Sequence, residues 1–206
     1  MSTLEPSSLD RIFKAYDVRG TVPDQLDEEL ARAVGNAFVQ VVPIDEARRV
    51  VVGHDMRPSS PGMARAFAEG AAAAGVDVTL VGLASTDQLY FASGHLGVPG
   101  AMFTASHNPA QYNGIKMCRA HAAPVGMESG LAEIRDLVAA GETVAADRPG
   151  TIEEKDVLAD YAAYLHTLVP VQGRRLKVVV DAGNGMAGLT APGVLGALAL
   201  EVVEMY

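Results

Sequence analysis

Short apolar segments alternate with amphipathic helical patterns in the first half of this sequence, and this alternation limits the fold more than any other feature. Apolar segments with the length of buried strands cover residues 49–53, 76–81 and 98–103. Helical patterns begin between them, near Ser60 and near Thr86. Alternating strands and helices favour sheets whose neighbouring strands run parallel, with helices covering both faces. The sequence therefore predicts an α/β protein with a mixed, largely parallel sheet sandwiched by helices.

The flanking segments complete one domain and open another. They predict an edge strand and two further helices, at residues 12–22, 27–41 and 127–140. Residues 141–155 lose this periodicity and collect glycine, proline and charge, which is typical of a linker. A helix and a strand–helix–strand pattern follow, and the chain then stops. We expect a first domain at 1–147, and at 148–206 a linker with the truncated opening β-α-β of a similar second domain.

A polar loop follows the strand predicted at residues 98–103. Its sequence is Thr104-Ala105-Ser106-His107-Asn108-Pro109. Pro109 cannot donate to a sheet, so the strand must end there. Ser106 is thereby placed at a strand end, where α/β proteins carry their chemistry. The sequence Asn113-Gly114-Ile115-Lys116 predicts a tight turn that returns the lysine toward this loop.

Three interpretations of this loop differ in what Ser106 does. A serine hydrolase fits poorly, because the sequence has no G-x-S-x-G elbow and adjacent Ser106 and His107 do not easily form a nucleophile–base pair. A phosphorylated serine fits better, since Lys116 supplies a cation that offsets the phosphate charge. An ordinary structural loop is the third interpretation, because serine, asparagine and proline are common loop residues.

Two other segments carry candidate site residues. Tyr16 and Arg19 lie in the predicted edge strand, where arginine is suited to bidentate phosphate contacts, although the segment alone favours an edge strand with a solvated charged face. His54 and Asp55 follow the first buried strand and resemble metal ligands. No second ligand pair lies at metal-binding spacing, so a strand-end turn is the favoured interpretation.

A glycine-rich segment suggests a different class of enzyme. Gly183-x-Gly185-x-x-Gly188 matches the dinucleotide-binding fingerprint and lies between a predicted strand and a predicted helix. An NAD-dependent oxidoreductase is therefore a rival hypothesis. A glycine turn that binds nothing accounts for the same residues.

Composition limits the partners and the compartment. A net charge of −9 argues against a nucleic-acid or anionic-membrane surface, so an anionic substrate requires a local basic pocket. The single cysteine, Cys118, agrees with a reducing compartment, and we expect a buried thiol rather than a nucleophile. The charged N-terminal residues do not resemble a signal peptide, and the uncharged stretch at 182–200 contains a proline and five glycines. These features predict a cytoplasmic protein without a membrane span.

Together, these segments resemble the α-D-phosphohexomutase superfamily, specifically its phosphomannomutase/phosphoglucomutase branch. The stretches that match its motifs, in family order, are Phe13 to Gly20 (F-K-A-Y-D-V-R-G), Gly53 to Ser59 (G-H-D-M-R-P-S), Thr104 to Pro109, Asn113 to Lys116, and Val178 to Gly185 (V-V-V-D-A-G-N-G). The pair T-A-S-H-N-P and N-G-I-K is highly specific. D-A-G-N-G opens the second domain in this family, which weakens the dinucleotide interpretation.

The resemblance implies an isomerase that interconverts hexose 6-phosphate and hexose 1-phosphate, with mannose or glucose as the sugar. It implies that Ser106 carries the phosphoryl group and that a bisphosphorylated sugar is the intermediate. Lys116 and Arg19 would stabilise the phosphoserine or assist proton transfer. His107 and Asn108 would shape the loop, and Tyr16 would line the sugar pocket.

The resemblance further implies Mg²⁺ bound by the Ser106 phosphate and by three aspartates of a D-G-D-x-D-R loop in the second domain. No D-x-D-x-D-R stretch occurs in these 206 residues. The two domains that read the sugar and hold its phosphate are missing as well. We therefore expect an inactive part of a mutase that binds Mg²⁺ poorly, with a non-catalytic binding module as a further alternative. Neither the preferred sugar nor the oligomeric state follows from the sequence.

Overall fold

The computed structural model describes residues 6–44, 48–169, 171 and 174–205, which form two compact units. The first unit extends to Lys155 and the second begins at Asp156. Among the described residues, no helix combines the length and the apolar character needed to cross a membrane.

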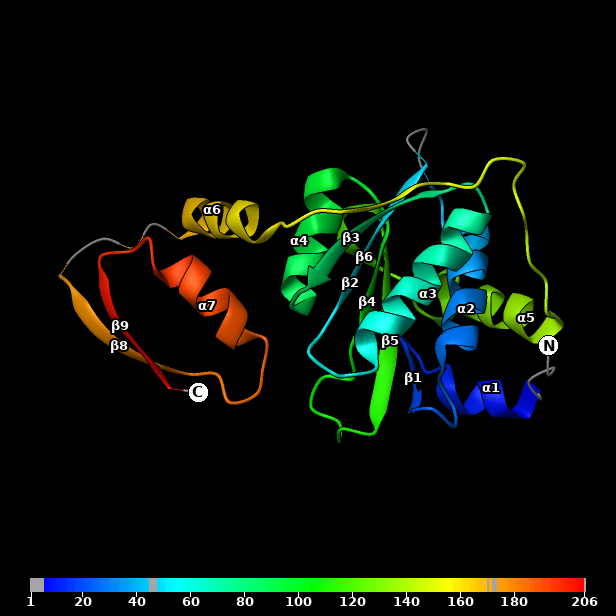
Figure 1. Ribbon diagram of the computed structural model, residues 1–206, viewed down its shortest axis with the longest axis horizontal. Coiled ribbons are helices and arrows are strands. Elements are labelled where there is room, and N and C mark those ends of the chain that lie inside the picture. Colours follow the sequence, from blue (N-terminus) through cyan, green and yellow to red (C-terminus); the bar gives the residue numbers. More distant parts are fainter. Residues whose placement is uncertain (1–5, 45–47, 170, 172–173, 206) are drawn as a thin grey trace. The chain divides into compact units, whose positions relative to one another are not determined.

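The first unit contains a mixed sheet and the helices that cover it (Figure 1). Its elements are α1 (Pro6–Ile12), β1 (Val18–Thr21), α2 (Glu28–Val41), β2 (Arg49–His54), α3 (Ser60–Ala73), β3 (Asp77–Leu83), α4 (Thr86–Leu96), β4 (Gly100–Phe103), β5 (Tyr112–Arg119), η1 (Ala120–Ala122), β6 (Ala123–Pro124), η2 (Met127–Ser129), α5 (Leu131–Ala140) and β7 (Ile152–Glu154). The strand order is β1-β5-β4-β2-β3-β7, and β6 pairs with β5. Strands β4, β2, β3 and β7 run parallel, whereas β5 is antiparallel to its neighbours. The predicted α/β fold with a mixed sheet is confirmed.

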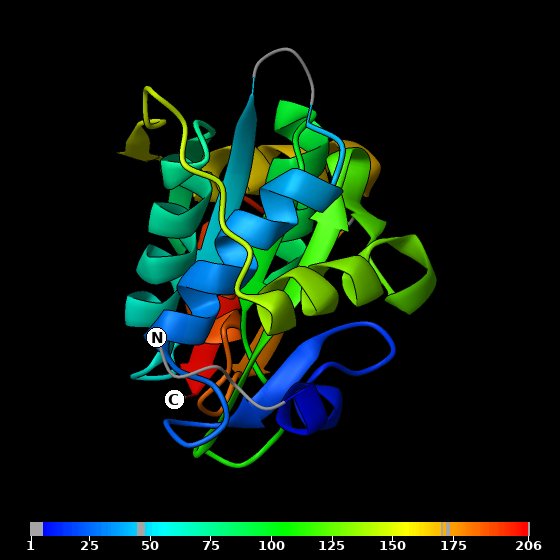
Figure 2. The same ribbon diagram turned by 90° about the vertical axis from the view of Figure 1, so that its right-hand side faces the viewer.

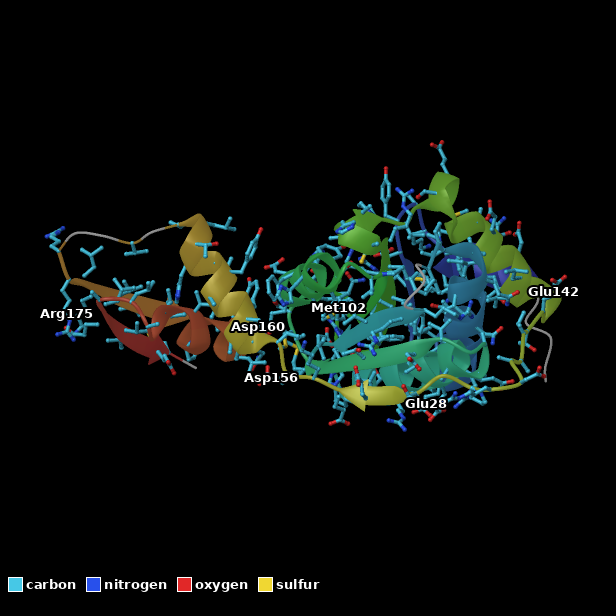
Figure 3. All side chains as sticks on the ribbon, turned by 90° about the horizontal axis from the view of Figure 1, so that it is seen from above. Glu28, Met102, Glu142, Asp156, Asp160 and Arg175 are labelled. Atoms are coloured by element: carbon cyan, nitrogen blue, oxygen red, sulfur yellow. The ribbon has the colours of Figure 1, made fainter. Side chains whose placement is uncertain are left out.

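Helices cover both faces of this sheet (Figures 1 and 2). On one face α2 and α3 pack against each other, α5 packs beside α2, and Phe38, Phe67 and Phe103 form a chain of ring contacts with centroids 5.5 and 5.7 Å apart. Helix α4 covers the opposite face, where Met102 is 1% exposed among closely packed side chains (Figure 3). Side chains of a strand alternate between faces, so each strand can contribute to both layers.

The segment from Asn113 to Lys116 is not a turn, contrary to the sequence-based prediction. It lies inside β5, where Val18 pairs with Ile115 and Met102 pairs with Lys116. The chain reverses earlier, in the loop between β4 and β5, which includes Ser106. An Asn-Gly pair often forms a hairpin turn, but strand pairing on both sides of β5 overrides that local preference here.

The second unit contains a strand–helix–strand segment. Its elements are α6 (Leu158–Leu168), β8 (Leu176–Asp181), α7 (Ala187–Leu195) and β9 (Leu200–Met205). Strands β8 and β9 pair in parallel with α7 as their connection, as the sequence predicted (Figure 1). Helix α6 packs on α7, and the His166 ring nitrogen Nε2 lies 2.7 Å from the Val194 carbonyl oxygen.

The division between the units lies after the boundary expected at residue 147. Part of the expected linker, Ile152–Glu154, forms β7 and extends the first sheet beside β3. This edge strand is mostly charged and is held through its backbone, so its side-chain pattern carries little sign of a strand.

Candidate active site

The Ser106 loop begins directly after β4. Ser106 is exposed, and its backbone φ of 55° lies in the left-handed region that residues other than glycine seldom adopt. Its N–H donates to the Thr104 hydroxyl over 3.0 Å. The loop is thus held at its start by Thr104 and presents the Ser106 hydroxyl to solvent.

Two cations lie on the same face of the sheet next to this loop. Strand alternation places Val18 and Ile115 in the core, so Arg19 and Lys116 extend from the opposite face. The Arg19 Nη1 group donates to the Asn108 Oδ1 atom over 3.2 Å, which connects β1 to the Ser106 loop. The predicted site residues Arg19, Asn108 and Ser106 are therefore brought together.

The Asp17 carboxylate links the two cations. Its Oδ2 atom accepts a hydrogen bond from Arg19 Nη2 over 2.6 Å and lies 3.5 Å from Lys116 Nζ. The Asp17 side chain is 12% exposed, whereas the Arg19 and Lys116 side chains are 26% and 29% exposed. Lys116 is therefore connected to the loop through Asp17 and Arg19. Asp17 lies within the F-K-A-Y-D-V-R-G motif, which does not by itself indicate this role.

Arg57 holds the Ser106 loop through the loop's backbone. It lies in the turn between β2 and α3, and its two terminal nitrogens donate to the carbonyl oxygens of Ser106, Asn108, Pro109 and Tyr112 over 2.8–2.9 Å. Its side chain is 10% exposed. Arg57 was not among the site residues predicted from the sequence, because its partners are backbone carbonyls, which a pattern of side chains does not indicate.

The other predicted site residues are more exposed. His107 Nδ1 lies 3.4 Å from Ser106 Oγ, which is long for a hydrogen bond, and both side chains face solvent. Tyr16 is 74% exposed and lies beside Gly126. Neither ring is fixed by a short hydrogen bond to Ser106.

Two ionisable groups on the α4 side of the sheet stay neutral near pH 7. Burial raises the pKa of the Tyr90 phenol, with smaller contributions from Cys118 and Asp17. Burial also raises the pKa of the Cys118 thiol, which is fully buried near Ser93. The expectation that the Cys118 thiol is buried is confirmed.

The described residues do not form a magnesium site by themselves. No group of three or more histidine, cysteine, aspartate or glutamate side chains in that part of the chain is arranged to hold a metal ion. Asp17 is engaged by Arg19 and Lys116, and Asp55 Oδ1 accepts from the Arg57 N–H and the Ser60 hydroxyl. Asp55 therefore acts in the strand-end turn that the sequence predicted.

Comparisons with known proteins identify a family that matches most of the chain. Residues 10–145 match the family described as phosphoglucomutase/phosphomannomutase, alpha/beta/alpha domain I. The chain belongs to the phosphoglucomutase/phosphomannomutase family. The recognition made from the T-A-S-H-N-P and N-G-I-K motifs is thereby confirmed.

Individual relatives agree with this family. A protein of Xanthomonas campestris pv. campestris (strain B100) named "Phosphohexose mutases" is 43% identical over 199 residues, which are 94% of this chain and 43% of the relative. The phosphomannomutase of Escherichia coli (strain K12) is 36% identical over 180 residues, covering 85% of this chain and 39% of the relative. The chain spans less than half the length of these curated relatives.

Solved structures extend the likeness into the second unit. The crystal structure of a phosphoglucomutase/phosphomannomutase family protein from Burkholderia thailandensis has a TM-score of 0.83 and 34% identity, and covers 98% of this chain and 44% of that one. A putative phosphomannomutase from Thermus thermophilus has a TM-score of 0.72 at 26% identity, over 93% of this chain and 45% of that one.

Proposed function

We propose that this chain is the phosphoserine-bearing part of a phosphohexomutase, which interconverts hexose 6-phosphate and hexose 1-phosphate of mannose, glucose or both. The observation that carries the proposal is the placement of Arg19 and Lys116 beside the exposed Ser106 loop, in a chain whose net charge is −9. Phosphoryl transfer depends on positioning and charge neutralisation, and this arrangement supplies both.

In the proposed reaction a sugar hydroxyl attacks the phosphorus of phosphorylated Ser106. A new bond forms between that oxygen and phosphorus, the bond to Ser106 Oγ breaks, and the hydroxyl proton passes to Ser106 Oγ, which becomes a free hydroxyl again. The bisphosphorylated sugar then returns its other phosphoryl group to Ser106 Oγ by the reverse steps. Arg19 and Lys116 offset the charge of the transferred group, and Lys116 serves proton transfer.

Asp17 gives the two cations a partner while Ser106 carries no phosphate. A phosphoserine adds a charge of about −1.5 to −2 near neutral pH, and that charge competes with the carboxylate for Arg19 and Lys116. Asn108 fixes the Arg19 guanidinium toward the loop, the exposed Ser106 and His107 side chains face open solvent beside it, and we propose that Tyr16 lines this space. We propose that this space receives the sugar phosphate.

The dinucleotide alternative has less support. The Gly183 N–H donates to Asp181 Oδ1 over 3.0 Å, and the Gly185 N–H donates to the Ala182 carbonyl over 2.9 Å, so the turn satisfies these donors internally. The likeness to the Burkholderia thailandensis structure covers 98% of the chain and includes this turn. Calorimetric titration with NAD tests the alternative, and we expect no heat of binding.

The test of the proposed function is a coupled mutase assay on the natural protein, started with hexose 1-phosphate and a hexose bisphosphate. We expect turnover that Ser106→Ala abolishes and that Lys116→Met reduces strongly. A polypeptide of these 206 residues alone should show no turnover, because it spans less than half the length of the related mutases. Undiminished turnover in Ser106→Ala would refute the proposal.

A further inference from the structure

Arg57 uses both terminal nitrogens of its guanidinium on the backbone of the Ser106 loop. Nη2 donates to the carbonyl oxygens of Ser106 and Asn108, and Nη1 donates to those of Pro109 and Tyr112. A guanidinium presents its donors in a rigid planar fork, so these four bonds fix the carbonyls relative to one another. The residue comes from a different segment, so the loop is held from outside itself.

The guanidinium is itself held in place. Asp55 Oδ1 accepts from the Arg57 N–H over 3.0 Å, and Asp55 Oδ2 lies 3.3 Å from Arg57 Nε. The Nε atom is buried and makes no directed hydrogen bond, so its contact with Asp55 is an ion pair. The Ser60 hydroxyl donates to Asp55 Oδ1 over 2.7 Å, and Asn113 Nδ2 on β5 donates to the Ser60 hydroxyl over 2.8 Å. Arg57 is therefore fixed by the turn after β2, by α3 and by β5 together.

This support matters most at Ser106, the residue of the loop whose backbone has a positive φ angle. A serine at φ 55° is in a conformation that persists only where its surroundings impose it. The Ser106 carbonyl is bonded to Arg57, and the Ser106 N–H is bonded to the Thr104 hydroxyl. Both peptide groups of Ser106 are therefore fixed, which sets the direction of its Cα–Cβ bond.

We propose that Arg57 is a positioning residue for phosphoryl transfer, which holds Ser106 in line with the sugar hydroxyl. The inference rests on the proposed function. Arg57 acts through the loop and does not contact the substrate, so its loss affects the rate of transfer more than the affinity for the sugar. Lysine cannot replace it, because a single ammonium group does not reproduce the fork that bonds four carbonyls.

The test measures the rate at which a hexose bisphosphate phosphorylates Ser106 in the natural protein and in Arg57→Lys. We expect the maximal rate to fall about 100-fold, as for a small misplacement of a reacting group. The concentration of bisphosphate giving half the maximal rate should change less than about threefold, since substrate contacts remain. The matched control is Arg48→Gln, because Arg48 donates to the carbonyls of Ala74 and Gly75 over 3.2–3.3 Å. The control should keep the wild-type rate.

A second variant decides the question if Arg57→Lys fails to fold. Asp55→Asn retains an acceptor for the Arg57 N–H and the Ser60 hydroxyl but removes the charge that faces Arg57 Nε. It should slow phosphorylation about tenfold with the same selectivity for rate over affinity. If Arg57→Lys folds and phosphorylates at the wild-type rate, the inference about Arg57 is overturned while the proposed function stands. If Arg57→Lys does not fold, a wild-type rate in Asp55→Asn has the same consequence. Wild-type protein phosphorylated elsewhere than Ser106 would overturn the proposed function and the inference with it.

Discussion

Replacing Gly114 with alanine adds a methyl group at the base of the Ser106 loop. Gly114 lies in β5 opposite Arg19, between β1 and the end of β4. An added Cβ atom would lie 2.5 Å from the Val18 carbonyl oxygen and 2.9 Å from the Thr104 carbonyl oxygen. Ordinary contacts begin at 3.4 Å, and both neighbours are backbone atoms that cannot turn aside as a side chain can.

The Val18 and Thr104 carbonyl groups must therefore move away from position 114, and the strand pairing of the sheet resists this movement. Overpacking of this kind costs about 1–3 kcal/mol, and we take about 2 kcal/mol for Gly114→Ala. For a chain of this size, that cost lowers the melting temperature of the first unit by roughly 4–8 °C. Part of the displacement passes to Thr104, whose hydroxyl accepts from the Ser106 N–H, so phosphorylation of Ser106 should slow as well.

Thermal unfolding followed by circular dichroism tests this expectation. The matched control is Gly94→Ala in α4, because a Cβ atom there would meet no neighbouring atom within 4 Å. Alanine in an exposed helix should leave stability unchanged or raise it by up to about 1 kcal/mol. If Gly114→Ala has the same melting temperature as the wild-type protein, the reasoning is refuted, because the close approach of β1, β5 and the Thr104 backbone then does not limit the size of the side chain at position 114.

Three further predictions concern charge and burial. Hydrogen bonds from Thr151 lower the pKa of the Asp77 carboxyl, so its stabilising effect is present at neutral pH and is lost as the pH falls through that lowered value. Urea unfolding should show Asp77→Asn to be less stable than wild type at pH 7 by about 1 kcal/mol, with the difference closing at low pH. Burial raises the pKa of the Cys118 thiol, so iodoacetamide should label Cys118 at pH 8 only after denaturation. With phosphoserine incorporated at position 106, ³¹P NMR should give it a second pKa below the usual value of about 6, and Asp17→Asn should lower it further by freeing two cations.

The alternation of strand and helix patterns was sufficient to predict the fold. Buried strands such as 49–53 and helices such as 27–41 lie where apolar periodicity placed them, since the same residues form the core. The turn predicted at Asn113 failed because the Asn113 side chain is buried against Ser59 and Ser60, which local sequence cannot indicate. Pairing of β5 with strands distant in sequence decided its conformation.

The candidate site could be predicted only in part. Ser106, Arg19 and Lys116 were selected from the sequence because the motifs that contain them resemble those of the phosphohexomutases, whereas the residues alone fitted an ordinary loop and a solvated strand as well. Arg57 was missed since its partners are backbone carbonyls of a loop about fifty residues away in sequence. Asp17 was missed because an acid beside an arginine in an edge strand is usually a solvated pair.

The measurement that tests the central claim most directly is the position of the phosphate. The natural protein is incubated with a hexose bisphosphate, its intact mass is determined, and its peptides are mapped. We predict the gain of one phosphate, located on Ser106 and absent from Ser106→Ala. A phosphate on any other residue, or one retained in Ser106→Ala, would contradict the assignment of Ser106 as the phosphoryl carrier.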